Sequence, residues 1–98
     1  MTIDTEPFDP AAYLEGEERI AAYLEDTMES GDAGVIADAL GVVARARGLT
    51  EVARDAGLSR DTLHRSLTQE GHPELETVVR VLRALGLRLS LAPVAPTA

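Results

Sequence analysis

The fold is decided by the stretch Thr50-Glu-Val-Ala-Arg-Asp-Ala-Gly-Leu-Ser-Arg-Asp-Thr-Leu-His-Arg-Ser-Leu67, which predicts two short helices joined by a tight turn. Thr50 is a good cap for the first helix, and Gly57 suits the turn because glycine tolerates a left-handed backbone. Ser59 is a good cap for the second helix, in which Leu63 and Leu67 are four residues apart and face inward. This is the pattern of a helix-turn-helix.

The outer face of the second helix is polar and is led by arginines. It carries Arg60, Asp61, His64 and Arg65. An arginine on an exposed helix can donate two hydrogen bonds to one guanine, so the pattern favours binding in the DNA major groove. The same residues also fit an ordinary helical hairpin whose charged face is solvated.

Length and composition restrict the class of protein. The chain has 98 residues and no cysteine, which favours one small domain without disulfides or thiolate metal sites. No apolar run approaches the length of a membrane span, and the N-terminus is acidic where a secretory signal would be basic and then apolar. We therefore expect a soluble, cytoplasmic protein that does not associate with membranes, of a size at which dimerisation often adds stability.

The net charge of -8 is distributed unevenly along the chain. Residues 1–40 hold eleven acids and one arginine, a net charge of -10, whereas residues 41–98 hold six acids and eight arginines, a net charge of +2. Such asymmetry indicates two surfaces with different partners, a basic one for the front of the chain and a polyanion for the rear. The alternative is that the acidic front only keeps the protein soluble.

Three further helices are predicted from apolar spacing and cap residues. The first spans 17–30, and the second runs from an Asp32 cap to about Arg47. The third follows a loop over 68–73, and its apolar face carries Leu75, Val78, Val79, Leu82 and Leu85. An acidic helical extension over 1–31, a helix-turn-helix domain over 32–92 and a flexible tail over 93–98 are the expected divisions of the chain.

The segment after the last helix alternates with period two and predicts a short β-strand. Leu87, Leu89 and Leu91 fall on one side of it, and Arg88 and Ser90 on the other. A lone strand has unpaired backbone groups, so we expect its copy in a homodimer to pair with it through these leucines. The alternative is an extended tail lying on its own domain.

The whole pattern resembles the lambda-repressor-like helix-turn-helix domains and, more narrowly, the HigA-like antidote proteins of toxin-antitoxin addiction modules. The resemblance lies in Phe8-Asp-Pro-Ala-Ala-Tyr-Leu14, in Ala39-Leu-Gly-Val-Val-Ala-Arg-Ala-Arg-Gly48, in Gly57-Leu-Ser-Arg-Asp-Thr-Leu63 and in Leu85-Gly-Leu-Arg-Leu-Ser-Leu-Ala-Pro93. It implies an all-α helix-turn-helix bundle with an extra N-terminal helix and a short C-terminal strand. It also implies a dimeric repressor of its own promoter that neutralises a RelE-like or HigB-like toxin.

Specific residues follow from this resemblance. The expected DNA contacts are Ser59, Arg60, Asp61, Thr62, His64 and Arg65, with the arginines contacting bases. The acids of the front of the chain and the apolar residues near them are instead the reason for the expected surface for a basic toxin, which is Phe8, Tyr13, Leu14, Glu17, Glu18 and Leu24. The chain departs from the family at Glu51, where glutamine is usual, and a carboxylate facing phosphates would repel them.

Three other functions remain open at this point. An enzyme is disfavoured because the two histidines form no recognised metal cluster and no phosphate-binding glycine loop is present, so we expect neither a metal nor a cofactor. A protein-interaction module that has lost DNA binding is favoured by Glu51 and by the negative total charge. A stand-alone helix-turn-helix regulator without a toxin partner is the third.

Overall fold

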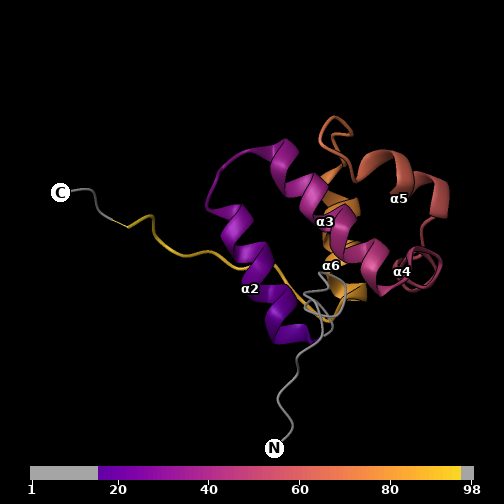
Figure 1. Ribbon diagram of the computed structural model, residues 1–98, viewed down its shortest axis with the longest axis horizontal. Helices are drawn as coiled ribbons and strands as arrows, with labels where there is room; N and C mark the ends of the chain where they lie inside the picture. The colour runs from indigo at the N-terminus through magenta and orange to yellow at the C-terminus, as the bar shows by residue number, and fades with distance from the viewer. Residues whose placement is uncertain (1–15, 96–98) are drawn as a thin grey trace, which may run out of the picture.

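The computed structural model describes residues 16–95, which contain five helices and no strand. The helices are α2 (Glu17–Met28), α3 (Ala33–Arg47), α4 (Leu49–Ala56), α5 (Arg60–Ser66) and α6 (Leu75–Ala84). In Figure 1, α3 crosses the middle of the molecule, with α2 on one side, α4 and α5 on the other, and α6 behind it. The all-helical class predicted from the sequence is confirmed for this part of the chain.

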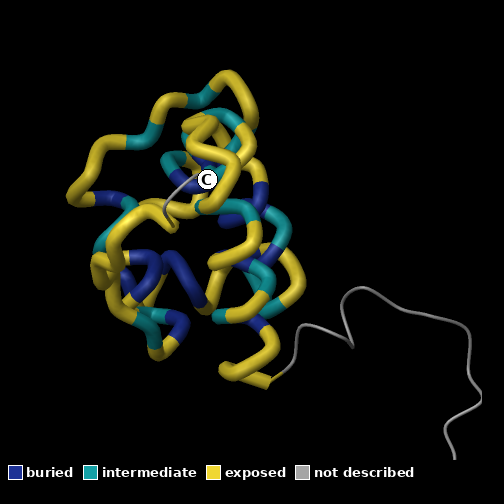
Figure 2. The backbone as a smooth tube through the Cα atoms, turned by 90° about the vertical axis from the view of Figure 1, so that its left-hand side faces the viewer, coloured by how far each residue is buried: buried dark blue, intermediate teal, exposed yellow. Residues whose placement is uncertain are grey.

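A single apolar core lies between these helices. Its fully buried large side chains come from every helix or its C-terminal boundary: Ile20, Leu40, Val43, Val52, Leu63, Leu67, Val81 and Leu85. Figure 2 shows the buried stretches of the chain inside the helix assembly and the exposed ones along its outside. Because Ile20 and Leu24 belong to this core, α2 contributes to the same packed unit as the other helices.

Two of the three predicted helix caps are confirmed. The Asp32 carboxylate accepts hydrogen bonds from the amides of Gly34 and Val35, and the Ser59 hydroxyl accepts one from the amide of Thr62. The predicted Thr50 cap is wrong, because α4 already begins at Leu49 and Gly48 precedes it. Gly48 has a φ of 117°, a backbone region that glycine adopts readily, and it both ends α3 and starts α4.

The predicted inner face of α6 is only partly correct. Leu82 and Leu85 are buried as expected, but Leu75 is 70% exposed. Val81, which the apolar spacing left out, is fully buried. Successive helical residues are about 100° apart, so the apolar residues on either side of Arg80 allow more than one inner face, and packing against α4 selects one that includes Val81.

The predicted strand over 87–91 is absent from the described residues. Residues 87–95 have no regular secondary structure and run away from the helices past α2 (Figure 1). Leu87 packs partly against the core, whereas Leu89 is 45% exposed and Leu91 is fully exposed. Within residues 16–95 this segment therefore has no strand to pair with, and Leu89 and Leu91 face solvent.

Two glycines on α3 allow the backbone after α5 to lie directly on that helix. Gly34 and Gly41 are seven residues apart, two turns of helix, and so share one face. A Cβ atom at Gly34 would lie 2.6 Å from the carbonyl oxygen of Gln69, and one at Gly41 would collide with the carbonyl oxygen of Leu67. Because both glycines lack a side chain, the C-terminal end of α5 and its following loop can lie directly against α3.

Leu63 anchors α5 in the core, so we expect Leu63→Ala to lower the free energy of unfolding by about 2–5 kcal/mol through lost burial and a residual cavity. Leu75→Ala is the matched control, since the same atoms are removed from a side chain that is 70% exposed, and it should change stability by less than about 0.5 kcal/mol. Urea denaturation of both variants measures the difference. Equal losses would show that α5 does not dock through Leu63.

Candidate nucleic-acid interface

Helix α5 is positioned by its inner face and by the turn that precedes it. Leu63 and Leu67 are fully buried, and Gly57 adopts the left-handed conformation (φ 72°, ψ 32°) predicted for the turn. Leu58 is half-buried against the core, and its amide donates to the carbonyl of Ala53. These contacts direct the opposite face of α5 to solvent.

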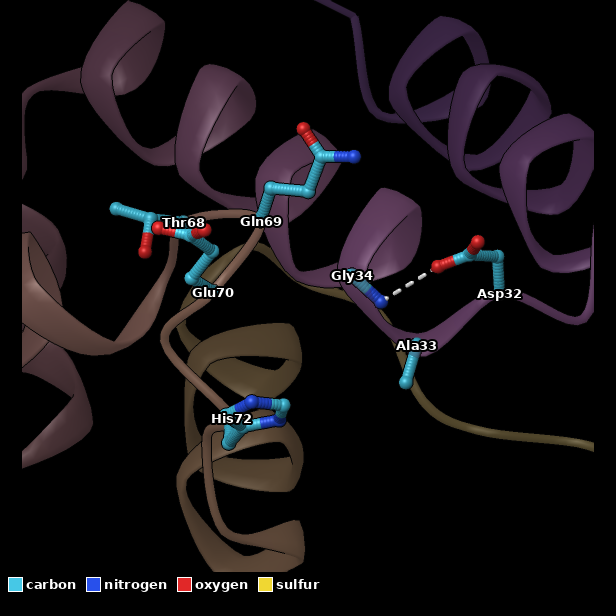
Figure 3. A pocket seen from close by; sticks show the side chains of 7 residues that line it. All are labelled: Asp32, Ala33, Gly34, Thr68, Gln69, Glu70 and His72. Atoms are coloured by element: carbon cyan, nitrogen blue, oxygen red, sulfur yellow. Dashed lines mark hydrogen bonds between the residues drawn. The ribbon is translucent and has the colours of Figure 1, made fainter.

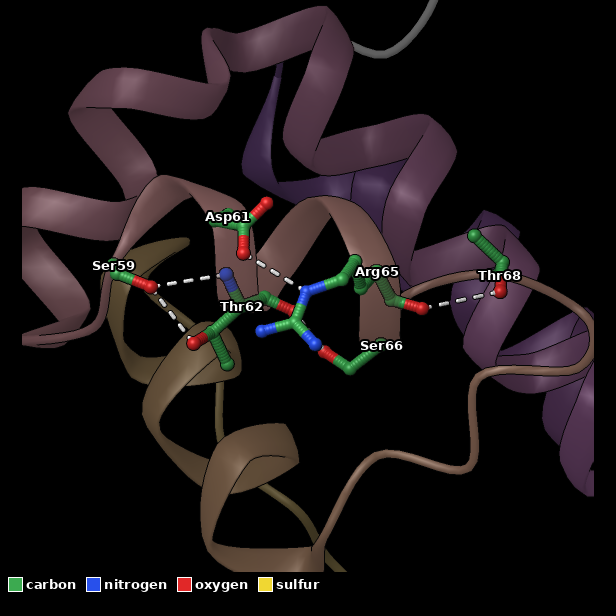
Figure 4. A network of polar contacts seen from close by, with 6 residues as sticks. All are labelled: Ser59, Asp61, Thr62, Arg65, Ser66 and Thr68. Atoms are coloured by element: carbon green, nitrogen blue, oxygen red, sulfur yellow. Dashed lines mark hydrogen bonds and ion pairs between the residues drawn. The ribbon is translucent and has the colours of Figure 1, made fainter.

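The first turn of α5 is organised by hydrogen bonds (Figure 4). The Ser59 hydroxyl accepts from the amide of Thr62 at 3.0 Å and donates to the hydroxyl oxygen of Thr62 at 2.7 Å. The hydroxyl of Ser66 donates to the carbonyl of Thr62 at 2.6 Å. The Ser59 hydroxyl thus caps α5. It gives a partner to the amide of Thr62, one of the first-turn amides that a helix leaves without a backbone acceptor.

Asp61 and Arg65 form an ion pair along the exposed face. The Nε of Arg65 donates to Oδ2 of Asp61 at 2.9 Å, and the two side chains are 71% and 73% exposed for Arg65 and Asp61 respectively. A solvent-exposed pair of this spacing contributes only about 0.3–0.5 kcal/mol. A bidentate arginine–guanine contact discriminates by about 1–3 kcal/mol. Asp61 can therefore hold Arg65 in free protein and release it to a stronger acceptor.

The other predicted contact residues on α5 are exposed as expected. Arg60 and His64 both lie on the solvent side, and Arg60 forms no ion pair with any residue between 16 and 95. Arg60, Asp61, His64 and Arg65 therefore share one exposed surface, with Ser59 and Thr62 at its edge. The structure brings together all six residues that the sequence assigned to DNA.

Glu51 turns toward the start of its own helix. It lies in the first turn of α4, and its Cβ and Cδ atoms would each be 4.0 Å from a Cβ atom at Gly48. A carboxylate at this end of a helix is favoured by the helix dipole. The side chain thus lies near the start of α4 and remains exposed.

The residues assigned to the toxin-binding surface have different positions. Phe8, Tyr13 and Leu14 lie outside the described residues. Glu17 and Glu18 are exposed in the first turn of α2. Leu24 is only 3% exposed, because it packs in the core with Ile20, and so it offers no surface to a partner. The spacing of Ile20 and Leu24 predicts an apolar face on this helix, but it does not show whether that face packs in the core or meets a partner.

A shallow hollow lies between the start of α3 and the loop after α5 (Figure 3). It is lined by Asp32, Ala33, Gly34, Thr68, Gln69, Glu70 and His72. The Asp32 carboxylate there is already used to cap α3.

Among the residues that the structure describes, no group of three or more histidine and carboxylate side chains could hold a metal ion. None of the described helices is long and apolar enough to cross a membrane.

Sequence reasoning missed Arg80 on α6. Its guanidinium contacts the carbonyl oxygen of Ala56 at the end of α4, beside the turn that leads into α5. The Glu76–Arg80 spacing of four residues on a predicted helix indicates an ion pair. The contact with Ala56 joins residues 24 positions apart, and no local pattern could have found it.

The geometry is that of a small all-helical protein with a short, well-anchored helix whose arginines face solvent. Residues 4–93 match the family described as probable addiction module antidote protein. The chain belongs to that family. It is also 40% identical over 91 residues to an uncharacterized protein from Haemophilus influenzae, an alignment that covers 93% of this chain and 94% of that protein. No solved structure matches the chain significantly.

Proposed function

We propose that this antidote protein is an antitoxin that binds its operator DNA through α5, represses its own module and neutralises a basic, RelE-like or HigB-like toxin. The observation that carries the DNA-binding part is the exposed face of α5, where two arginines project from a helix whose other side is locked into the core. Major-groove recognition requires this combination of a fixed backbone and solvent-exposed side chains. We also propose that the helix-turn-helix formed by α4 and α5 is of the lambda-repressor-like type.

The roles of the six α5 residues follow from their chemistry. Arg60 and Arg65 donate to guanine O6 and N7. Asp61 accepts from cytosine N4 or orients Arg65, as it does in the free protein. Ser59 and Thr62 lie at the N-terminal end of the helix, where hydroxyls and amides meet phosphates, and His64 is a further contact on the same face.

Arg65→Ala should weaken binding to a duplex from the protein's own upstream region by about 1–3 kcal/mol, because one base contact is lost while the fold is unaffected. Fluorescence anisotropy at two salt concentrations measures the affinity, and circular dichroism checks the fold. Arg83→Ala is the matched control, since it removes an exposed arginine from α6. Equal effects of the two substitutions would contradict the assignment of α5 to base contacts.

The second candidate function is a protein-interaction module without DNA binding. Glu51 favours it, because an exposed carboxylate within the α4–α5 unit opposes a polyanion. The direction of its side chain toward Gly48 reduces this opposition. The salt dependence of the anisotropy titration separates the two functions, since phosphate contacts make affinity fall steeply as salt rises.

Operator binding by this protein requires a dimer, because one recognition helix covers only half of a two-fold operator. Leu89 and Leu91 of the C-terminal segment are exposed and supply the contact, and we propose that they and the half-buried Leu87 pair with their copies in a second chain. Two recognition helices would then be about 34 Å apart, which is one turn of B-DNA.

Leu91→Ser should weaken this dimer by roughly tenfold or more, since a leucine side chain buried between copies is worth about 1.5–3 kcal/mol. Val94→Ser is the control, because Val94 is 92% exposed but lies beyond the alternating leucines. Analytical ultracentrifugation measures both dissociation constants. A wild-type protein that stays monomeric at micromolar concentration would refute the dimer, and so would equal weakening by Val94→Ser.

The toxin-binding surface of the proposal consists of Glu17 and Glu18 on α2 together with Phe8, Tyr13 and Leu14. Leu24 is left out of it, because its burial gives it a role in the core. Exposed acids steer a basic partner toward the surface, and apolar side chains provide most of the binding energy once it has docked.

Glu18→Gln should slow association with a co-expressed toxin by about twofold and have little effect on dissociation. Tyr13→Ala should instead weaken the complex by about tenfold or more. Surface plasmon resonance separates the two rates, and Glu70→Gln, which removes one exposed acid from the loop after α5, is the charge control. If Glu70→Gln slows association as much as Glu18→Gln, the acidic front has no specific role in binding.

A further inference from the structure

The C-terminal end of α4 is held by an arginine from a helix that the DNA-binding proposal does not use. Nη1 of Arg80 on α6 donates to the carbonyl oxygen of Ala56 at 3.3 Å. Nε and Nη2 of the same guanidinium donate to Oε2 of Glu76 at 3.2 and 3.0 Å. One guanidinium therefore bridges a carboxylate on its own helix and the last carbonyl of α4.

This contact completes the end of α4 at the point where the chain turns toward α5. The carbonyls of Ala53 and Arg54 accept from the amides of Leu58 and Gly57, and that of Ala56 accepts from Arg80. A cation at the C-terminal end of a helix is also favoured by the helix dipole. Arg80 thus adds a tertiary contact to a turn that is otherwise held by local hydrogen bonds.

The guanidinium lies against the turn itself. A Cβ atom at Gly57 would be 3.1 Å from Nη1 of Arg80, so the missing side chain at Gly57 leaves room for it. Three residues, Gly57 to Ser59, separate α4 from α5. Because the turn is this short, a change in the backbone at Ala56 or Gly57 is passed directly to the start of α5.

We infer that Arg80, held by Glu76, is a positioning residue for DNA recognition: it fixes the α4–α5 turn and so sets the angle at which Arg60 and Arg65 meet the bases. The inference rests on the proposed function of α5. Base contacts require side chains to be placed within about 0.5 Å and 10–20°, which is why a residue outside the interface can control specificity. The buried leucines of α5 determine which face is inside, and the turn determines its tilt.

A positioning role and a direct phosphate contact by Arg80 predict opposite effects when Glu76 is removed. Under the positioning role, Glu76→Ala releases the guanidinium and weakens operator binding by roughly twofold to threefold, although a negative charge has been removed. If Arg80 contacts phosphate directly, the same substitution strengthens binding. Glu74→Ala is the matched control, since Glu74 is an exposed acid at the start of the same helix and its side chain makes no cap hydrogen bond.

Arg80→Ala should weaken binding to the operator duplex by roughly threefold to tenfold. For a scrambled duplex of equal length, Arg80→Ala and Arg83→Ala should change the affinity by the same amount, since each substitution removes one exposed charge from α6. In the Arg65→Ala background the effect on the operator should shrink, because Arg80 acts through the residues of α5. The inference would be overturned if the effects of Arg80→Ala and Arg65→Ala on operator affinity were fully additive. It would also be overturned if Arg80→Ala weakened binding to both duplexes equally, or if Glu76→Ala tightened binding as much as Glu74→Ala.

A second measurement separates this inference from the proposed function. Amide hydrogen exchange of Gly57 and Leu58 should become faster in Arg80→Ala than in Arg83→Ala, because the turn loses its tertiary contact. If the wild-type protein does not bind the operator, the proposed function fails and exchange alone decides whether Arg80 holds the turn. Exchange rates equal in the two variants would show that it does not.

Discussion

The structure depends on the close packing of α5 and its following loop against α3. Leu63 and Leu67 bury one side of a seven-residue helix that is too short to be stable alone. Gly34 and Gly41 let the backbone of residues 67–69 rest on α3 without an intervening side chain. Because this contact fixes the inner side of α5, it also fixes which residues are exposed, and the arginine face results from the packing.

The elements that the sequence predicts well are those set by local chemistry. The Asp32 and Ser59 caps, the left-handed Gly57 and the inward leucines of α5 all depend on neighbouring residues, and all are present. The side chain of Thr50 suits a cap, but α3 ends at Gly48 and α4 already begins at Leu49. The inner face of α6 and the contact between Arg80 and Ala56 are set by tertiary packing, which periodicity does not encode. Arg60, Asp61, His64 and Arg65 could be placed on one exposed face from the sequence. The spacing of Leu24 with Ile20 indicates an apolar face, but not whether that face packs in the core or meets a partner.

The two charged surfaces of the protein belong to one packed unit. Helix α2 presents Glu17 and Glu18 to solvent while Ile20 and Leu24 join the core that supports α3 and α5. A toxin on α2 and DNA on α5 would therefore both bind the same folded state, and each would stabilise it by mass action. Under the proposed function, one small domain would meet a basic toxin through α2 and DNA through α5.

The central claim is that α5 is the surface that meets DNA, and the most direct measurement is an NMR titration of the ¹⁵N-labelled protein with a duplex from its own upstream region. The proposed function predicts that the amide shifts concentrate on residues 59–66 and the adjoining turn, and that α2 is little affected. Shifts confined to α2, or a spectrum unchanged at saturating DNA and low salt, would contradict it.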